Sequence, residues 1–181
     1  MLKLSKKEML EKWLLLTRME PLRADCRVTR SYGIDLEALA AIEMRMWYVN
    51  LMCHGPLEWL PVTDIAASAR LSAGDDDTLT VTLPGECMRP VSVRLYGWER
   101  PAAVSSPGSR HALMQTNPFA RGGVCRPVAV LGRDGRILRL HSSPGRPADA
   151  RLQSLMCVAD PGDDTYIFHE DALSSIKPLQ F

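Results

Sequence analysis

The pattern that most constrains this fold is the run of short alternating segments that follows Pro61. From there on, apolar and polar residues alternate with a period of two, whereas the preceding residues show the helical period of 3.6. The clearest example is LPGECMRPVSVRLYGW, residues 83–98, which opens with a Pro-Gly turn and continues as an alternating strand to a Gly-Trp pair. A period of two places successive side chains on opposite faces of a sheet. The sequence therefore predicts a β-rich body over residues 61–181.

Two helices are predicted before this body. The segment Ser5-Lys6-Lys7-Glu8 has the spacing of a capping box and predicts the start of a helix that ends by Pro21. Asp35 is the expected N-cap of a second helix, which Gly55-Pro56 ends with the glycine in the left-handed conformation. Helical spacing predicts an inward apolar stripe on this second helix, made of Leu39, Ile42, Met46, Val49 and Cys53.

About seven short strands are predicted after Pro61, and the hairpin around Gly132-Arg133-Asp134-Gly135 has the clearest turn. The expected strands are Ile65–Leu71, Leu79–Leu83, Val91–Tyr96, Val128–Leu131, Arg136–His141, Leu152–Ala159 and Thr165–Phe168. Residues 101–123 are rich in Pro, Ser, Gly and Asn and predict a long loop with a short helical turn near Arg110–Met114.

These elements predict an α+β fold, in which two N-terminal helices precede a mainly antiparallel β-sandwich or rolled sheet. The length of 181 residues fits one domain, 1–181. Within it, the helical part of residues 1–56 is expected to pack on the body of residues 61–181.

Charge is nearly balanced over the whole chain but uneven along it. The net charge is +1, yet residues 99–151 carry nine arginines against three acidic residues. Solvated strand faces explain such a segment most simply, and an acidic protein partner is the next reading, because guanidinium groups pair well with carboxylates. Overall neutrality argues against nucleic acid as a partner. No stretch has the ~18 consecutive apolar residues of a membrane span, so we expect a cytoplasmic protein with no membrane contact.

Neither a metal nor another cofactor is expected. The five cysteines are an odd number, widely spaced and without a Cys-x-x-Cys motif, so they are expected to be reduced apolar residues. Cys53-His54 lacks a second pair at finger-like spacing. The aspartates at 75–77 and at 160–164 lack the ligand pattern of a calcium loop and are interpreted as turns.

No motif identifies a nucleophile, and the chain is expected not to be an enzyme. The alternative is a small β-rich enzyme or ligand-binding domain that uses cysteine and histidine side chains. It would require a concave pocket that gathers at least two of His111, His141, Cys125 and Cys157. Cys125 with His141 is the first pair to test as a dyad.

The residue types of the long loop suggest protein contact. Trp98 ends a strand beside Gly97, at the base of the loop; burial beneath the loop is expected, and exposure toward a partner is the alternative. The partner would be another copy of the chain or another protein. The residues expected to carry the contact are Arg110, Asn117, Phe119, Arg121 and Arg126, with Trp98 at their base.

Four segments between Leu83 and Phe168 resemble small virion proteins of tailed phages and prophages. They are LPGECMRPVSVRLYGW, MQTNPFARGG, RPVAVLGRDGRILRL and LQSLMCVADP. Their order is similar to that in the neck or head–tail connector group, and the similarity covers about half of the chain. The resemblance implies helices before a β-rich body, a ring of many copies between capsid and tail, and no catalytic residue. It also implies a place in the virion instead of the cytoplasm.

Overall fold

The computed structural model describes residues 1–17, 36–74, 78–117 and 119–177, and these form two compact units. Unit 1 comprises residues 1–61 and 160–181, and unit 2 comprises residues 62–159. The sequence of unit 2 therefore lies between the two parts of unit 1. Residues 61–181, the expected β-rich body, contribute to both units. That these residues form one domain with the helices stays a prediction.

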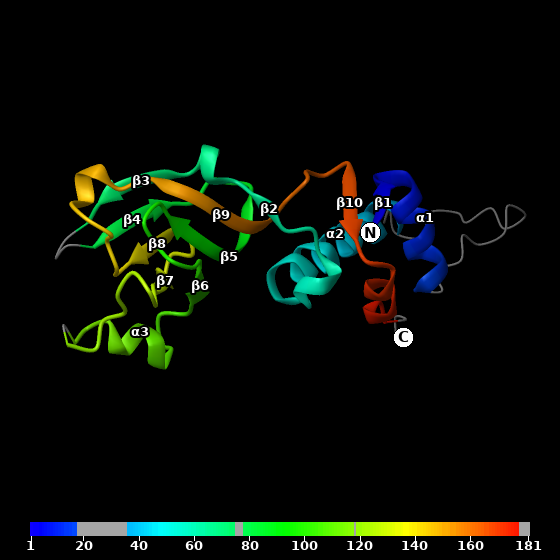
Figure 1. Cartoon of the computed structure of the whole chain (residues 1–181). Coiled ribbons are helices and arrows are strands. Elements are labelled where there is room, and N and C mark those ends of the chain that lie inside the picture. Colours follow the sequence, from blue (N-terminus) through cyan, green and yellow to red (C-terminus); the bar gives the residue numbers. More distant parts are fainter. Residues whose placement is uncertain (18–35, 75–77, 118, 178–181) are drawn as a thin grey trace, which may run out of the picture. The chain divides into compact units, whose positions relative to one another are not determined.

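Unit 1 combines helices with a two-stranded ribbon (Figure 1). Strand β1 (Leu2–Ser5) pairs antiparallel with β10 (Thr165–Phe168), with Leu4 opposite Tyr166. Helix α1 (Lys6–Leu16) follows β1 directly, and α2 spans Leu36–His54. Short 3₁₀ helices lie at Leu57–Trp59 and Glu170–Ser175. Pro21 and Asp35, predicted to bound the two helices, lie outside the described residues.

The predicted capping box at the start of α1 is confirmed. The Glu8 N–H donates to Ser5 Oγ at 3.4 Å, and the Ser5 N–H donates to Glu8 Oε2 at 2.8 Å. These bonds satisfy two backbone donors that no helical carbonyl can reach. The backbone and hydroxyl hydrogen bonds from Ser5 lower the pKa of Glu8.

Replacing Ser5 with alanine is expected to destabilise the first turn of α1 by about 0.5–2 kcal/mol, because one backbone donor loses its acceptor. Faster amide hydrogen exchange at Lys7 and Glu8 would report this change. Ser5→Thr, which keeps the hydroxyl, is the control. Since the pKa of Glu8 is lowered in the folded state, the contribution of the box is present above the ordinary glutamate pKa and is lost as the pH falls through the lowered one. Exchange in Ser5→Ala that stays at the wild-type rate would contradict this role.

The predicted inward stripe of α2 is wrong. Leu39, Ile42 and Met46 are exposed, by 40%, 58% and 67% of their surface, while Val49 and Cys53 are half-buried. The buried side chains lie on the other face and are Ala40, Met44, Tyr48, Leu51 and Met52. Both faces of this helix carry apolar residues, so spacing alone does not identify the packed one.

Aromatic contacts select the packed face of α2. The centroid of the Tyr48 ring lies 4.9 Å from that of Tyr166. The centroid of the Trp47 ring lies 5.5 Å from that of Phe168, with the two ring planes at nearly a right angle. Trp13 of α1 completes the cluster at 5.8 Å from Trp47. Edge-to-face and tilted pairs at such distances are favourable beyond the area they bury. Trp13 and Trp47 are thus packing residues of unit 1.

Unit 2 is one curled, mixed sheet of eight strands (Figure 1). The strand order is β2-β9-β5-β6-β7-β8-β4-β3. The bounds are β2 Thr63–Asp64, β3 Arg70–Ala73, β4 Leu79–Thr82, β5 Cys87–Leu95, β6 Ala102–Ser105, β7 Ala129–Leu131, β8 Ile137–Leu140 and β9 Leu152–Ala159. The α+β class is confirmed, whereas the antiparallel sandwich is not.

Alternation along the strands builds the core of unit 2. In β4, Leu79 and Val81 are buried and Thr80 is half-buried; in β8, Leu138 and Leu140 are buried and Arg139 is exposed. Facing side chains from β5 and β9 complete one hydrophobic cluster. Because Thr80 and Thr82 of β4 and Arg139 of β8 face outward, these polar side chains are free to line a surface site.

Three local predictions differ from the structure. Residues 65–71 do not form one strand: Ala66–Ser68 is a 3₁₀ turn, and β3 begins at Arg70. Residues 102–105, expected in the loop, form β6, which pairs parallel with β7. Gly55 does not have a positive φ; its N–H continues the helical bonding to the Leu51 oxygen at 2.7 Å. A Cβ there would lie 2.6 Å from that oxygen, so close approach explains the glycine.

Candidate functional site

The candidate site is the polar segment between β6 and β7, which we call the α3 loop, residues 106–128. Its helix α3 spans Arg110–Met114, as predicted. The Ser109 side chain accepts a hydrogen bond from the Ala112 N–H at 3.2 Å and so caps the first turn. The side chains of Leu113 and Met114 are exposed by 63% and 42% of their surface.

Gln115 holds the α3 loop together. It is buried, with 3% exposure, and its amide donates to the His111 oxygen at 2.9 Å while its Oε1 accepts from the Gly122 N–H at 3.2 Å. Its backbone oxygen accepts from Arg121 Nε at 2.9 Å. One buried amide thus joins residues before and after the loop tip. No sequence pattern indicates the role of Gln115, because an isolated glutamine carries no motif.

The tip of the loop presents Phe119. The Asn117 side chain accepts from the Phe119 N–H at 3.0 Å, which forms a local turn, and the Phe119 side chain is 99% exposed. Asn117 therefore serves the loop's own backbone. An aromatic ring in full contact with water, on a loop tied down at Gln115, is available to a partner.

Trp98 lies beneath the loop. Its side chain is 2% exposed, and its indole N–H donates to the Ser142 oxygen at 2.5 Å. The Ser142 hydroxyl in turn donates to the Gly122 oxygen. The expected burial is therefore correct, and the expectation that Trp98 itself carries a partner contact needs correction, because its ring supports the loop from below.

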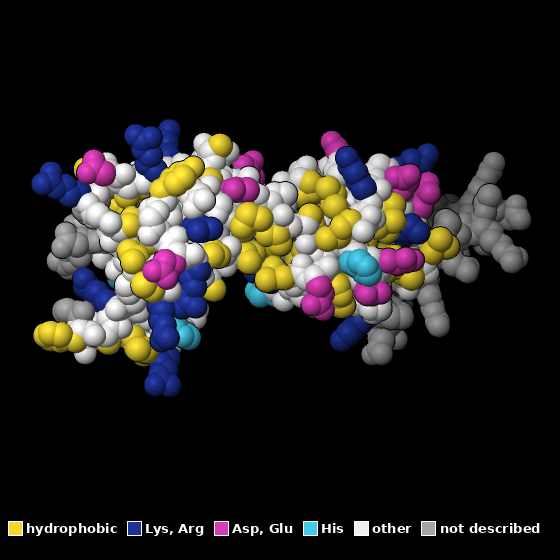
Figure 2. Space-filling model, in the orientation of Figure 1, with side chains coloured by type: hydrophobic (Ala, Val, Ile, Leu, Met, Phe, Trp, Pro, Cys, Tyr) yellow, Lys and Arg dark blue, Asp and Glu magenta, His cyan; other side chains and the backbone are white. Residues whose placement is uncertain are grey.

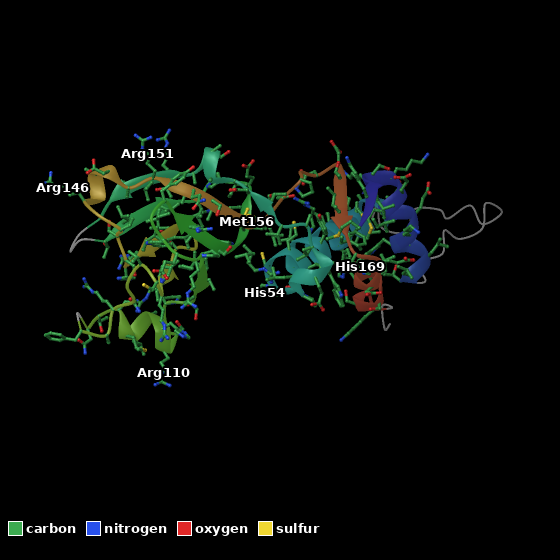
Figure 3. All side chains as sticks on the ribbon, viewed as in Figure 1. His54, Arg110, Arg146, Arg151, Met156 and His169 are labelled. Atoms are coloured by element: carbon green, nitrogen blue, oxygen red, sulfur yellow. The ribbon has the colours of Figure 1, made fainter. Side chains whose placement is uncertain are left out.

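The three predicted arginines occupy different positions. Arg110 begins α3 and projects away from it (Figure 3). Arg126 is exposed, and its backbone N–H donates to the Gly123 oxygen at 3.0 Å to form a turn. Arg121 is half-buried and is held by Gln115. Figure 2 shows basic side chains at the α3 end of unit 2 and also on its opposite side.

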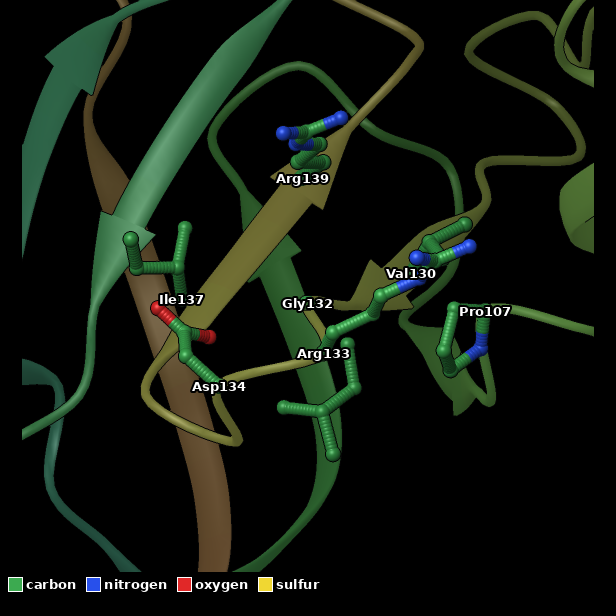
Figure 4. Close-up of a pocket in the computed structure, with 8 residues that line it drawn as sticks. Pro107, Val130, Gly132, Arg133, Asp134, Ile137 and Arg139 are labelled. Carbon is green, nitrogen blue, oxygen red and sulfur yellow. The ribbon is translucent and has the colours of Figure 1, made fainter.

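Beside the α3 loop, a pocket of about 670 Å³ opens over the outer face of β4 and β8. We call it the arginine pocket; its polar lining includes Arg121, Arg139, His141, Thr80, Thr116 and Gln115. A second hollow of about 500 Å³, at the β7–β8 turn, is mainly apolar and is lined by Pro107, Val130, Ile137 and the stem of Arg139 among others (Figure 4). Only the first of these two hollows carries a histidine.

The proposed cysteine–histidine dyad is not among the contacts of the described residues. The Cys125 thiol donates to Glu99 Oε1 at 3.1 Å, and this hydrogen bond is the main cause of a raised Cys125 pKa. A nucleophilic thiol needs a lowered pKa. Cys157 is buried in the core beside Cys87, and the hydrogen bond that its thiol donates to the Cys87 sulfur raises the pKa of Cys157.

Searches of the described residues give two further results. No group of three or more His, Cys, Asp or Glu side chains there has the geometry to hold a metal ion. In the same part of the chain, no helix is both long and apolar enough to cross a membrane.

Comparison with known proteins adds no relative. No protein-family model matches the chain. A search of curated proteins also gives no match.

Proposed function

We propose that this chain is a non-enzymatic assembly protein that acts through contacts with another copy of itself or with another protein. The observation that carries the proposal is the Phe119 side chain, 99% exposed on the α3 loop. Exposed aromatic rings cost solvation free energy, and at interfaces they supply a large part of the binding energy.

A second exposed apolar surface supports the same function. Leu39, Ile42 and Met46 follow one another at helical spacing on the exposed face of α2. Contiguous apolar residues on a helix surface are typical of protein-contact faces. Unit 1 and unit 2 therefore each carry an exposed apolar surface.

The charges of the two units are complementary. Unit 2 contains twelve arginines and eight acidic residues, a net charge of +4, whereas unit 1 contains ten basic and thirteen acidic residues, a net charge of −3. Contact between unit 2 of one copy and unit 1 of the next would bring opposite charges together. Head-to-tail contacts of this kind produce rings or filaments.

The more specific function, a neck or head–tail connector component of a phage virion, rests on the resemblance of the segments between Leu83 and Phe168. A ring of copies would fit both the complementary charges and the loop-tip aromatic. Electron microscopy of the purified protein tests it, because closed rings are expected and a population without rings would contradict it.

Replacing Phe119 with serine is expected to weaken self-association about tenfold or more, since an interface aromatic is lost. Light scattering coupled to size exclusion, over a range of protein concentrations, measures the oligomer. Tyr96→Ser is the matched control, because Tyr96 is an exposed aromatic at the end of β5. Association should also weaken as salt is raised.

Two results would oppose assembly as a homo-oligomer. One is a strict monomer at high concentration and low salt; the other is an equal loss of association in Phe119→Ser and Tyr96→Ser. If the protein is a strict monomer, the proposal requires a different protein as the partner. Binding to that partner should then be lost in Phe119→Ser and retained in Tyr96→Ser.

The alternative, a β-rich enzyme or ligand-binding domain, requires two of His111, His141, Cys125 and Cys157 in one pocket. Of these four, His141 alone lines the arginine pocket. A thiol titration of the folded protein tests the enzyme: one cysteine of markedly low pKa would favour it, whereas an exposed Cys125 that titrates above the ordinary cysteine pKa, with the buried thiols unreactive until unfolding, would favour the assembly protein.

A further inference from the structure

The arginine pocket lies between the outer face of the sheet and the α3 loop. Its floor is the outer face of β4 and β8, where Thr80 lies opposite Arg139 in the register. Its wall is the end of the α3 loop, with Gln115, Thr116 and Arg121. All of these residues belong to unit 2, so the pocket is built within one compact unit. Its volume of about 670 Å³ falls within the usual range for small-molecule sites.

The sheet directs the polar side chains into the pocket. Leu138 and Leu140 of β8 are buried in the core, so the alternating residues Ile137, Arg139 and His141 lie on the opposite face. On the wall, Arg121 is held through its Nε by the Gln115 oxygen, which leaves the terminal guanidinium nitrogens for other partners. Arg121 is therefore held in place before any ligand arrives, and the position of Arg139 in β8 directs it to the same face.

The charged side chains that line the pocket are all basic: Arg121, Arg139 and His141. None of the ion pairs found between described residues involves Arg121 or Arg139. His141 Nδ1 is buried and makes no hydrogen bond to any described residue. The positive charge of this pocket is thus not compensated by carboxylates of the described chain.

We propose that the arginine pocket binds the phosphate group of a small molecule, held by Arg121 and Arg139 with help from His141. Guanidinium groups offer only donors, in a planar fork that matches two oxygens of a phosphate. Threonine hydroxyls and a histidine nitrogen at the same surface supply further donors. The charges of the described lining residues disfavour a cation. Inorganic phosphate and a phosphate ester share this chemistry, and the experiment separates them.

The electrostatics of His141 agree with this geometry. Burial, followed by the nearby charges of Arg121 and Arg139, lowers the pKa of His141. These arginines are the other charged groups that line the pocket. An anion bound between them would raise that pKa again, and binding should therefore be tighter as the pH falls through the His141 pKa. Sulfate, whose charge does not change between about pH 5 and 8, is the probe for this measurement. Any pH dependence of its binding then comes from a titrating group of the protein.

The test is a titration of the full chain with inorganic phosphate, pyrophosphate and adenosine monophosphate at constant ionic strength. Heteronuclear NMR follows the ring resonances of the four histidines. We expect a saturable shift of the His141 signals with at least one of these probes. Saturation by inorganic phosphate alone identifies the free ion, whereas tighter binding of adenosine monophosphate identifies an ester.

Arg121→Gln and Arg139→Gln should each weaken binding about tenfold or more, because each removes a charge-assisted pair. Arg151→Gln is the matched control: it makes the same charge change at an exposed residue away from α3 (Figure 3). Thermal melts without ligand establish that each variant folds. Equal weakening in all three variants would show an unspecific charge effect and overturn the proposal.

The sequence places Asp75, Asp76 and Asp77 between the lining residues Gly74 and Thr78, outside the described residues. The titration is therefore repeated with all three changed to asparagine. Absence of a saturable shift of the His141 signals in both the unchanged chain and the variant with three asparagines overturns the proposal. Arg139→Gln and Phe119→Ser keep this site separable from assembly, because the first should change phosphate binding alone and the second association alone.

Discussion

Replacing Trp98 with alanine is expected to lower the free energy of unfolding of unit 2 by about 3–5 kcal/mol, the usual cost of truncating a buried tryptophan. The ring is 2% exposed, and it belongs to the hydrophobic cluster of the sheet. The substitution also removes the indole N–H that donates to the Ser142 oxygen. Because Ser142 bonds to the Gly122 oxygen, the α3 loop should loosen as well.

Denaturant unfolding combined with hydrogen exchange of the full chain measures both effects. Amides of β5 and β8 report the stability of unit 2, and the Gly122 amide reports the loop. Trp98→Phe is the control: it keeps a ring but removes the donor, so this variant should lose about 1–2 kcal/mol of unfolding free energy. A loss below 1 kcal/mol in Trp98→Ala would show that the ring does not support the loop.

Replacing Tyr48 with alanine is expected to destabilise unit 1 by about 3–5 kcal/mol, because a fully buried ring is removed. This ring is 1% exposed and packs on Tyr166 and Phe168 of β10. Its hydroxyl accepts from the Ile167 N–H at 3.0 Å and donates to the Ile167 oxygen at 3.1 Å. The single side chain therefore fixes α2 against the free edge of β10.

Tyr48→Phe separates the two roles. It retains the ring packing but leaves both backbone groups of Ile167 without their partner, so a loss of about 1–3 kcal/mol is expected. Exchange of the Ile167 amide measures it directly. Burial raises the pKa of Tyr48, so its contribution is present below the ordinary tyrosine pKa and is lost as the pH rises through the raised one. An unchanged Ile167 exchange rate in Tyr48→Phe would contradict the hydroxyl's role.

Several elements could be predicted from the sequence because a local interaction defines each one. The capping box joins residues three apart, and the β7–β8 hairpin turns on Gly135, whose φ of 68° suits glycine. The bounds of β9 and β10 agree with their alternation, and α3 was predicted at its observed place. Within such segments, propensity, turn chemistry and periodicity indicate the same structure.

The candidate site was only partly predictable. Exposed polar loops can be recognised by composition, which led to Phe119 and the arginines around it. Gln115 was missed because its role depends on His111, Arg121 and Gly122 reaching it together. Sequence patterns indicate Arg139 only as a strand residue and His141 as a strand residue or a partner of Cys125, since their neighbours in the arginine pocket come from β4 and from the α3 loop.

Local sequence alone determined the start of α1, the β7–β8 turn and the inward residues of β4 and β8, since hydrogen bonds and alternation over a few residues suffice. The tertiary structure decided the rest. It selected the Tyr48 face of α2 over the equally apolar Ile42 face, because aromatic partners on β10 lie more than a hundred residues away in sequence. It also paired β6 parallel to β7 and brought two arginines and a histidine to one pocket. Such contacts depend on chain segments that meet only after folding, and no short pattern encodes them.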